Sequence, residues 1–427
     1  MVLSLLLAAW FAADGEPRPT LKAGEIKGVI EIDGRLSEID WLNAAAIPDL
    51  TMLEPVAGGP PTGRTEIKVM ANEREIVIGV RCFDPDPSRI VAFTKERDGD
   101  FESEDHLLFV IDPFQDGRSG YVFSVNPGGA RFDGLVVSNG ESVDQSWDGV
   151  WEAAADRDAE GWSAEIRIPV FSINFAKGLS AWGLNVQRRI QRNQETERWA
   201  GASRDTKVYQ TTRAGLLTDL PDFDLGLGLS IRPALVGGFE QPSRNSSTSA
   251  TGDVSLDLAK RLGPNLTASV TINTDFAETE ADTRQTNLTR FPLFFPEKRA
   301  FFLEGSDTFV FGLGLSNDIR PFFSRRIGLV AGKEVPILAG AKLSGRQGKT
   351  SLGGLVVRTR EEEGVAPATS LAALRVRRNV LDESSVGFIA TKGDPLGRPG
   401  ASTFGVDLTY QNSRFRGGKN FWLGPGA

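Results

Sequence analysis

Residues 254–273 read VSLDLAKRLGPNLTASVTIN, and apolar side chains in this stretch alternate with small polar ones on both sides of the turn at residues 262–265. A period of two predicts two antiparallel β-strands joined by a tight turn. Similar strand pairs can be drawn through residues 338–360, 370–391 and 402–415. The alternation fits a membrane barrel with its apolar side chains turned outward. It fits equally well a soluble sandwich with the same side chains turned inward, so periodicity alone leaves both open.

The first half of the chain has a different pattern of short apolar runs separated by clusters of Gly, Pro, Asp and Asn, with almost no helical periodicity. Many short strands with regular turn signals predict a β-sandwich. The strands that we expect most clearly cover residues 65–69, 75–83, 107–111, 121–125, 162–168 and 182–189.

Composition excludes several classes of function. The formal net charge is -8, and Lys and Arg are interspersed with Asp and Glu, so the chain has no basic patch for nucleic acid. With one cysteine, Cys82, and one histidine, His106, the chain cannot form an intramolecular disulfide or a Cys/His zinc site. Both residues lie in apolar strands, and we expect both to be structural. We therefore predict no metal site built from these residues and no nucleic-acid partner.

The N-terminal segment contains an apolar run, LSLLLAAWFAA at residues 3–13, that is too short to cross a bilayer and has the length of a signal-peptide core. We expect residues 1–15 to be a signal peptide, cut short at its start because no Lys or Arg precedes the run. The alternative is a buried N-terminal helix.

Four strings in the first half carry a family resemblance: GVIEIDGRLSEIDW (residues 28–41), SEDHLLFVIDP (103–113), WDGVW (147–151) and GWSAEIRIP (161–169). They resemble the family 9 carbohydrate-binding module over residues 25–217. The resemblance implies an immunoglobulin-like or jelly-roll sandwich that binds a glycan or oligosaccharide.

A second resemblance lies in residues 273–311, which contain TRF and the string FFPEKRAFFLEG. This block looks like the signature of an uncharacterised domain that commonly follows the module in bacterial envelope proteins and is similar to an outer-membrane barrel. The resemblance favours the barrel for residues 222–427. We expect this barrel to be incomplete, because the alternating strands end near Phe421-Trp422-Leu423 without an evident closing strand. The fold class that we predict is all-β, a sandwich followed by an incomplete antiparallel transmembrane-type barrel in contact with outer-membrane lipid.

Sugar recognition needs flat rings beside planar polar groups. Trp147 and Trp151 flank Asp148-Gly149 in a polar loop, and Trp199 follows the polar run 191–198. We predict that these three tryptophans bind the ligand by stacking. The alternative for each is a place in the core, as we expect for Trp41, Trp162 and Trp182.

No organic cofactor is predicted. The carbohydrate-binding family often carries structural calcium, and acidic loops at residues 84–86, 98–100 and 102–105 could supply oxygen ligands. No loop has the twelve-residue calcium pattern, and ordinary solvated turns are the alternative.

Catalysis has two candidate residues, Glu297 and Glu304, because a carboxyl group among aromatic side chains can have a perturbed pKa and glycoside hydrolysis needs two carboxyl groups. The alternative is a structural ion pair of Glu297 with Lys298 or Arg299.

Three functions follow from these patterns. The first is a cell-envelope protein whose sandwich captures glycan on an outer-membrane barrel, in connection with polysaccharide catabolism. The second is a glycoside hydrolase. The third is a structural or transport barrel whose sandwich has lost its ligand and acts as a plug.

Overall fold

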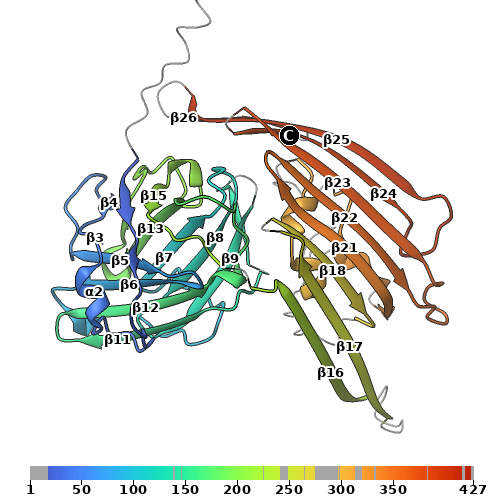
Figure 1. Cartoon of the computed structure of the whole chain (residues 1–427), viewed down its shortest axis with the longest axis horizontal. Helices are drawn as coiled ribbons and strands as arrows, with labels where there is room; N and C mark the ends of the chain where they lie inside the picture. The colour runs from blue at the N-terminus through green and yellow to red at the C-terminus, as the bar shows by residue number, and fades with distance from the viewer. Residues whose placement is uncertain are drawn as a thin grey trace, which may run out of the picture. The chain divides into compact units, whose positions relative to one another are not determined.

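The structure is a computed structural model of the whole chain, and it describes residues 18–137, 140–145, 147–224, 226–240, 249–263, 265–274, 297, 299–312, 320–330, 333–381, 383–415 and 419–424. The predicted signal peptide and most of the block at residues 273–311 lie outside the described residues. The chain divides into two compact units, Met1–Leu225 with Tyr410–Leu423, and Gly226–Thr409 with Gly424–Ala427. The predicted all-β fold is confirmed (Figure 1).

The first unit contains two sheets of nine and six strands. The nine-stranded sheet consists of β1 (Thr20–Lys22), β15 (Gly215–Thr218), β13 (Trp182–Ile190), β7 (His106–Asp112), β8 (Gly120–Val125), β9 (Arg131–Val137) and β10 (Ser142–Asp144), with β14 (Glu195–Arg198) and β4 (Thr51–Glu54) attached at β13. The six-stranded sheet consists of β11 (Glu152–Asp158), β12 (Gly161–Pro169), β6 (Glu75–Phe83), β5 (Thr65–Ala71), β2 (Gly24–Glu25) and β3 (Ala46–Ile47). All six strands that the sequence predicts most clearly are present.

The core of this unit lies between the two sheets because alternate side chains of their strands point toward each other. From the six-stranded sheet come Ile67, Val69, Ile78 and Val80, and from the nine-stranded sheet come Phe109, Ile111, Phe123, Leu184 and Val186, all fully buried. Cys82 belongs to the same core, as expected. The two sheets therefore form a β-sandwich.

The two ends of the sandwich meet in one pair of strands. β1, the first strand, pairs in parallel with β15, the last, through Thr20–Leu216, Leu21–Leu217 and Lys22–Thr218. A short helix, α2 (Ile39–Asn43), follows the IDG turn of the first family string and buries Trp41.

The third large sheet makes up most of the second unit, and every strand in it is antiparallel to the next (Figure 1). In order across the sheet the strands are β16 (Leu229–Glu240), β17 (Ser249–Arg261), β18 (Leu266–Ile272), β21 (Ile337–Gln347), β22 (Thr350–Thr359), β23 (Ser370–Val380), β24 (Ser384–Lys392), β25 (Ser402–Phe415) and β26 (Lys419–Leu423). Its last strand, β26, and the end of β25 fall in the segment Tyr410–Leu423 that is grouped with the first unit. The hairpins at residues 254–273, 338–360 and 370–391 are confirmed as β17–β18, β21–β22 and β23–β24. The strand pair expected within residues 402–415 is wrong, because these residues form the single strand β25.

Between β18 and β21 the chain leaves the sheet and forms short elements: α3 (Ala300–Leu303), the 3-10 turns η7 (Ser306–Phe309) and η8 (Ser324–Arg326), and a small ribbon of β19 (Leu329–Val330) and β20 (Lys333–Glu334). Phe301, Phe302 and Phe309 from these elements pack on Leu355, Val357, Leu371 and Ala373 of the sheet. They therefore cover part of one face of the sheet. No helix within the described ranges has the length and apolar character needed to cross a bilayer.

Candidate functional site

The three tryptophans predicted to stack on sugar all contact the sandwich core. Trp151 is only 3% exposed, and its indole Nε1 donates a hydrogen bond to Asp133 Oδ1 at 3.0 Å. Its ring packs edge to face on Phe123, with 5.2 Å between centroids. The prediction for Trp151 is therefore wrong, because a buried ring has no face left for a sugar.

Trp147 and Trp199 are half-buried. The Trp147 ring lies 4.9 Å from that of Tyr121, and Trp199 packs against the core above Gly215, where a side chain would collide with the indole. Part of each ring remains accessible, so a contact with ligand stays a prediction for these two residues.

The first and last family strings are joined by one buried carboxylate, Glu165 on β12. Its Oε2 accepts the backbone N–H groups of Asp33 and Gly34 at 3.2 and 3.1 Å, and its Oε1 accepts the Trp41 indole N–H at 3.0 Å. Burial raises the pKa of Glu165 to about 7, although its hydrogen-bond donors oppose the rise. Glu165, Trp41 and the turn at Asp33 and Gly34 therefore connect the first string to the last inside the sandwich.

The acidic loops considered for calcium are satisfied by protein groups. Asp84 forms a bidentate ion pair with Arg192, and Glu104 accepts the backbone N–H groups of Phe93 and Thr94 at 2.9 and 3.0 Å. Asp98 lies beside Arg97, and Asp100 accepts the N–H of Glu102 within its own turn. Within the described ranges no three Asp, Glu, His or Cys side chains are grouped to hold a metal ion. These loops do not fit a calcium site.

The outer face of the nine-stranded sheet carries a group of ring and charged side chains that the sequence did not single out. Val208 and Tyr209, in the segment after β14, pack over Leu108, Val110, Val122 and Val136, with Phe132 beside them. Phe132 and Tyr209 are half-buried, so part of each ring faces solvent.

Charged groups lie close to this surface. Burial raises the pKa of the Tyr209 hydroxyl, and the charge of Glu102 adds to the rise while that of Arg198 opposes it. Phe101 lies 6.4 Å from the imidazole of His106, whose pKa is lowered by burial. We call Phe132, Tyr209, Glu102 and Arg198 the outer-face group. The sequence offered one sign of this group: Tyr209, one of three tyrosines in the chain, lies in a polar loop.

In the second unit the burial of side chains along the strands is inverted relative to a water-soluble sheet. On β25, Val406 and Leu408 are 69% and 58% exposed, whereas Asp407 and Thr409 between and after them are 2% and 1% exposed. On β18, Val270 and Ile272 are exposed while Ser269 and Thr271 are buried.

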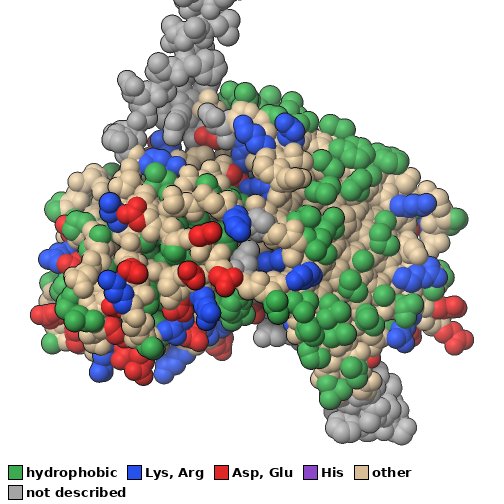
Figure 2. All heavy atoms as spheres, viewed as in Figure 1, with side chains coloured by type: hydrophobic (Ala, Val, Ile, Leu, Met, Phe, Trp, Pro, Cys, Tyr) green, Lys and Arg blue, Asp and Glu red, His purple; other side chains and the backbone are tan. Residues whose placement is uncertain are grey.

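The inversion extends across neighbouring strands because paired residues share a face. One such row is apolar in all its members: Ile231, Leu258, Val270, Ala341, Val356 and Ala372. The row one residue further along starts with Arg232, Asp257 and Thr271 and points to the other face. Figure 2 shows hydrophobic side chains spread over the strands of this unit. We call this surface the apolar face.

The opposite face of the sheet, which carries α3 and η7, holds a buried ionic network. Arg375 pairs with Asp407 through both guanidinium nitrogens, with 2.8 Å between Nη2 and Oδ2, and Gly312 N–H donates to the same carboxylate. Lys342 Nζ donates to the backbone carbonyls of Phe301 and Glu304 and so holds the C-terminal end of α3.

Glu297, a predicted catalytic residue, forms a separate buried ion pair with Arg299. Its Oε1 and Oε2 accept Arg299 Nε and Nη2 at 2.9 and 2.8 Å, and Arg299 also donates to the backbone carbonyls of Ser324 and Ile327. A carboxylate paired with a buried guanidinium stays ionised and cannot serve as a proton donor. Glu297 and Arg299 thus form the ion pair considered as the structural alternative, and a catalytic role for Glu297 stays a prediction.

Glu304 is half-buried and lines a small recess with Arg232, Asp257 and Ser269. Its carboxylate lies 3.5 Å from the Ser269 hydroxyl. A catalytic role for Glu304 likewise stays a prediction.

Comparisons with known proteins separate the two units. Residues 227–352 match the family described as "Domain of unknown function (DUF5916)". No curated protein matches the chain. Among solved structures, a Bacteroides uniformis protein described as carbohydrate-binding is 14% identical over 48% of this chain and 100% of its own, with a TM-score of 0.40. Two family 9 carbohydrate-binding module structures from Caldicellulosiruptor kristjanssonii, one in complex with cellotriose and one with glucose, are 13% and 14% identical. Each covers 48% of this chain, and 95% and 97% of their own chains, with TM-scores of 0.35 and 0.34. The matched part of the second unit is thus similar to a family of unknown function.

Proposed function

We propose that this chain is a cell-envelope protein whose second unit lies in outer-membrane lipid through its apolar face and whose sandwich binds glycan. The observation that carries the first part is the inverted burial on β18 and β25, where apolar residues are exposed and polar residues are buried. A soluble protein rarely exposes a contiguous apolar surface of this kind, because its contact with water is unfavourable.

Strand length and polarity agree with this assignment. A strand needs about 9 to 11 residues to cross the hydrocarbon layer at a tilt near 45°. β21, β22 and β23 contain 11, 10 and 11 residues. The proposal also requires further strands to pair with the outer edges of β16 and β26, since an unpaired backbone edge is unfavourable in lipid.

Fluorescence quenching by lipid tests this assignment. We would label Val270→Cys and, as a control, Val29→Cys on the sandwich with an environment-sensitive dye, in the full chain reconstituted into phosphatidylcholine vesicles carrying nitroxides on their acyl chains. Native Cys82 would not compete for the dye, because it is fully buried and burial raises the pKa of its thiol to about 12. The dye at position 270 should be quenched and the dye at position 29 should not. A dye at position 270 that is not quenched in vesicle-bound protein would contradict the proposal.

Glycan binding by the sandwich is supported by the four family strings and by the outer-face group. Partly exposed rings beside an exposed carboxylate, here that of Glu102, are a combination that binds the C–H faces and hydroxyls of a pyranose. The similar solved modules contain cellotriose and glucose, which are therefore the first ligands to test.

Titration calorimetry of the full chain with cellotriose and glucose would test this part. Tyr209→Ala and Phe132→Ala should weaken binding roughly fivefold or more, because stacking of a ring contributes on the order of 1 kcal/mol or more. Phe171→Ala is the matched control, since Phe171 is a 58% exposed ring that follows a strand of the other sheet. Equal losses in all three variants, or no binding by the unmodified chain to any oligosaccharide, would contradict the assignment.

A further inference from the structure

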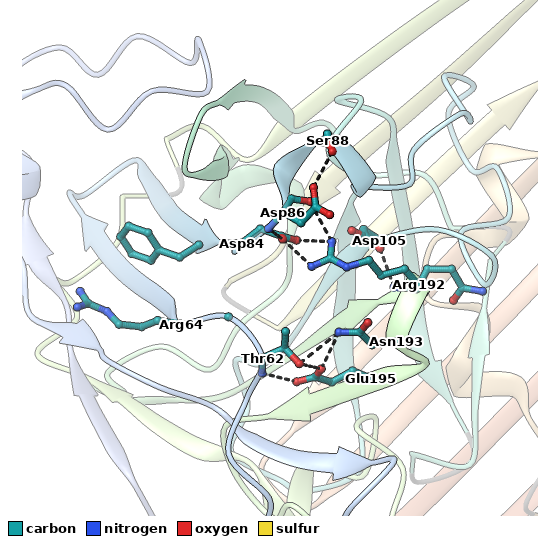
Figure 3. Close-up of polar contacts among 12 residues, drawn as sticks. Thr62, Arg64, Asp84, Asp86, Ser88, Asp105, Arg192, Asn193 and Glu195 are labelled. Atoms are coloured by element: carbon teal, nitrogen blue, oxygen red, sulfur yellow. Dashed lines mark hydrogen bonds and ion pairs between the residues drawn. The ribbon is translucent and has the colours of Figure 1, made fainter.

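Three carboxylates lie around one guanidinium at one end of the sandwich. Figure 3 shows Asp84, Asp86 and Asp105 around the side chain of Arg192. Arg192 Nη1 and Nη2 donate to Asp84 Oδ2 and Oδ1 at 2.7 and 2.6 Å, and Nη1 also lies 3.4 Å from the backbone carbonyl of Asp86. The side chains of Asp84 and Arg192 are only 1% and 8% exposed, so this is a buried ion pair.

Neighbouring groups also donate hydrogen bonds to each of the three carboxylates. Asp84 Oδ1 accepts the backbone N–H of Asp86 at 2.7 Å, and Asp105 Oδ1 accepts that of Gln191 at 2.6 Å. Asp86 Oδ1 accepts the Ser88 hydroxyl at 2.6 Å. Each of the three carboxylates therefore accepts at least one hydrogen bond from the chain itself.

The pair joins elements that are far apart in the sequence and belong to different sheets. Asp84 directly follows β6 of the six-stranded sheet, whereas Arg192 lies in the turn η4 (Gln191–Asn193) between β13 and β14 of the nine-stranded sheet. Asp105 directly precedes β7 of the latter sheet. The ion pair thus connects the two layers of the sandwich at this end.

The charges explain why a cation is needed at this position. Burial by itself raises the pKa of Asp84, but the hydrogen bonds from Arg192 and Asp86 and the charge of Arg192 outweigh it and keep the pKa below its ordinary value. Burial raises the pKa of Asp105, which Arg188 and Arg192 oppose. Without a positive charge, buried carboxylates this close together would repel each other.

We propose that Arg192 takes the place of a structural divalent cation: its guanidinium neutralises Asp84, Asp86 and Asp105 and clamps the two sheets, so the sandwich is stable without calcium. A calcium ion bound here would need the two carboxylate oxygens of Asp84, and the guanidinium already binds both of them. The inference does not depend on glycan binding or on membrane insertion.

Thermal unfolding of the full chain in detergent, followed by tryptophan fluorescence, tests the inference. Six of the eight tryptophans belong to the sandwich, so the signal reports mainly this unit. The transition of the unmodified chain should be the same in EGTA and in millimolar CaCl2. Arg192→Gln should lower the transition temperature in EGTA by roughly 10 °C, because removal of one member of a buried pair leaves an uncompensated charge. Millimolar CaCl2 should restore a large part of this loss.

Two controls make the result specific. Arg89→Gln removes an exposed arginine from the neighbouring turn η1 (Pro87–Arg89) and should change neither the transition nor its response to calcium. Adding Asp84→Asn to Arg192→Gln should abolish the restoration by calcium. A transition of the unmodified chain that falls in EGTA, or an Arg192→Gln loss that calcium does not reverse, would overturn the inference. If Arg192→Gln does not fold, equilibrium dialysis of the unmodified chain with calcium decides the question, and stoichiometric binding at micromolar calcium would overturn it.

Discussion

The indole N–H of Trp41 donates to Glu165 Oε1 at 3.0 Å, across 124 positions of sequence, and this bond ties the first family string of the sandwich to the last. Both side chains are fully buried, at 1% and 0% exposure. The same carboxylate closes the turn at Asp33 and Gly34.

Replacing Glu165 with alanine should therefore destabilise the sandwich strongly. Three donors would lose their acceptor inside the protein, at a cost of about 1 kcal/mol or more for each. Glu165→Gln keeps one acceptor oxygen and should lose less. Urea unfolding followed by tryptophan fluorescence would measure both variants, and equal losses would show that the hydrogen bonds do not account for the effect.

Stability of the sandwich should fall as the pH rises from neutral toward 8. Burial raises the pKa of Glu197 to about 8, with Arg188 opposing the rise and Glu195 adding to it. An unfolded glutamate titrates near about 4.3, so between these values the folded state holds a proton that the unfolded state has released. Rising pH therefore favours unfolding, by at most about 1.4 kcal/mol per pH unit, and the effect levels off above the folded pKa.

Glu197→Gln should flatten this dependence. The comparison is best made from pH 7 to 9, because His106, whose pKa is lowered by burial, acts in the opposite sense only below the ordinary histidine range. The midpoints of urea unfolding at three pH values would measure this dependence in both chains. A stability that rises over this range in the unmodified chain would contradict the role given to Glu197.

Gly387 on β24 should not tolerate a side chain. A Cβ at this position would collide with Asp407 and with the guanidinium of Arg375, which pair directly over the glycine. Gly387→Ala should destabilise the second unit by about 1 to 3 kcal/mol, the usual cost of overpacking. Gly354→Ala on β22 is the control, since nothing lies within 4 Å of its added carbon. Resistance of the folded sheet to trypsin would distinguish the two variants.

The pair of Glu297 and Arg299 should be costly to break and less costly to remove entirely. Arg299→Met leaves a buried carboxylate without its partner and should cost about 3 to 5 kcal/mol, whereas adding Glu297→Leu should recover much of the loss. Proteolysis of the segment at residues 297–330 would report both changes. A single variant as resistant as the unmodified chain would contradict the structural role of the pair.

Leu408→Arg should impair assembly of the second unit into vesicles. Leu408 is central in β25 and 58% exposed on the apolar face, and an arginine near the middle of the bilayer costs about 2 to 4 kcal/mol. Val29→Arg changes a 91% exposed valine of the sandwich and should have no effect. The fraction of protein that floats with vesicles in a density gradient measures the difference, and equal flotation would argue against contact of this face with lipid.

Strands and hairpins could be predicted from the sequence because their signals are local. The alternation at residues 254–273 and the turn at residues 262–265 each need only neighbouring residues, and both agree with β17 and β18. Alternation alone could not say which face is buried. The structure shows which face is buried, because Asp407 is buried and Val406 is exposed.

Side-chain orientation and long-range pairs were harder to predict. The spacing in WDGVW does not reveal that Trp151 turns inward to Asp133, because that partner lies 18 residues away on another strand. Glu165 and Arg192 were missed for the same reason, with partners 124 and 108 positions distant. Glu297 was the easier case, because its partner is two residues away and was one of the alternatives considered.

The pairing of β1 with β15 has a mechanical consequence. The two strands are parallel, so the residues before β1 and those after β15 leave the ladder at opposite ends. Tension applied between these two connections would load the hydrogen bonds of the ladder together in shear, instead of opening them one after another. Force on the chain would therefore meet resistance along the whole β1–β15 ladder before the sandwich core was exposed.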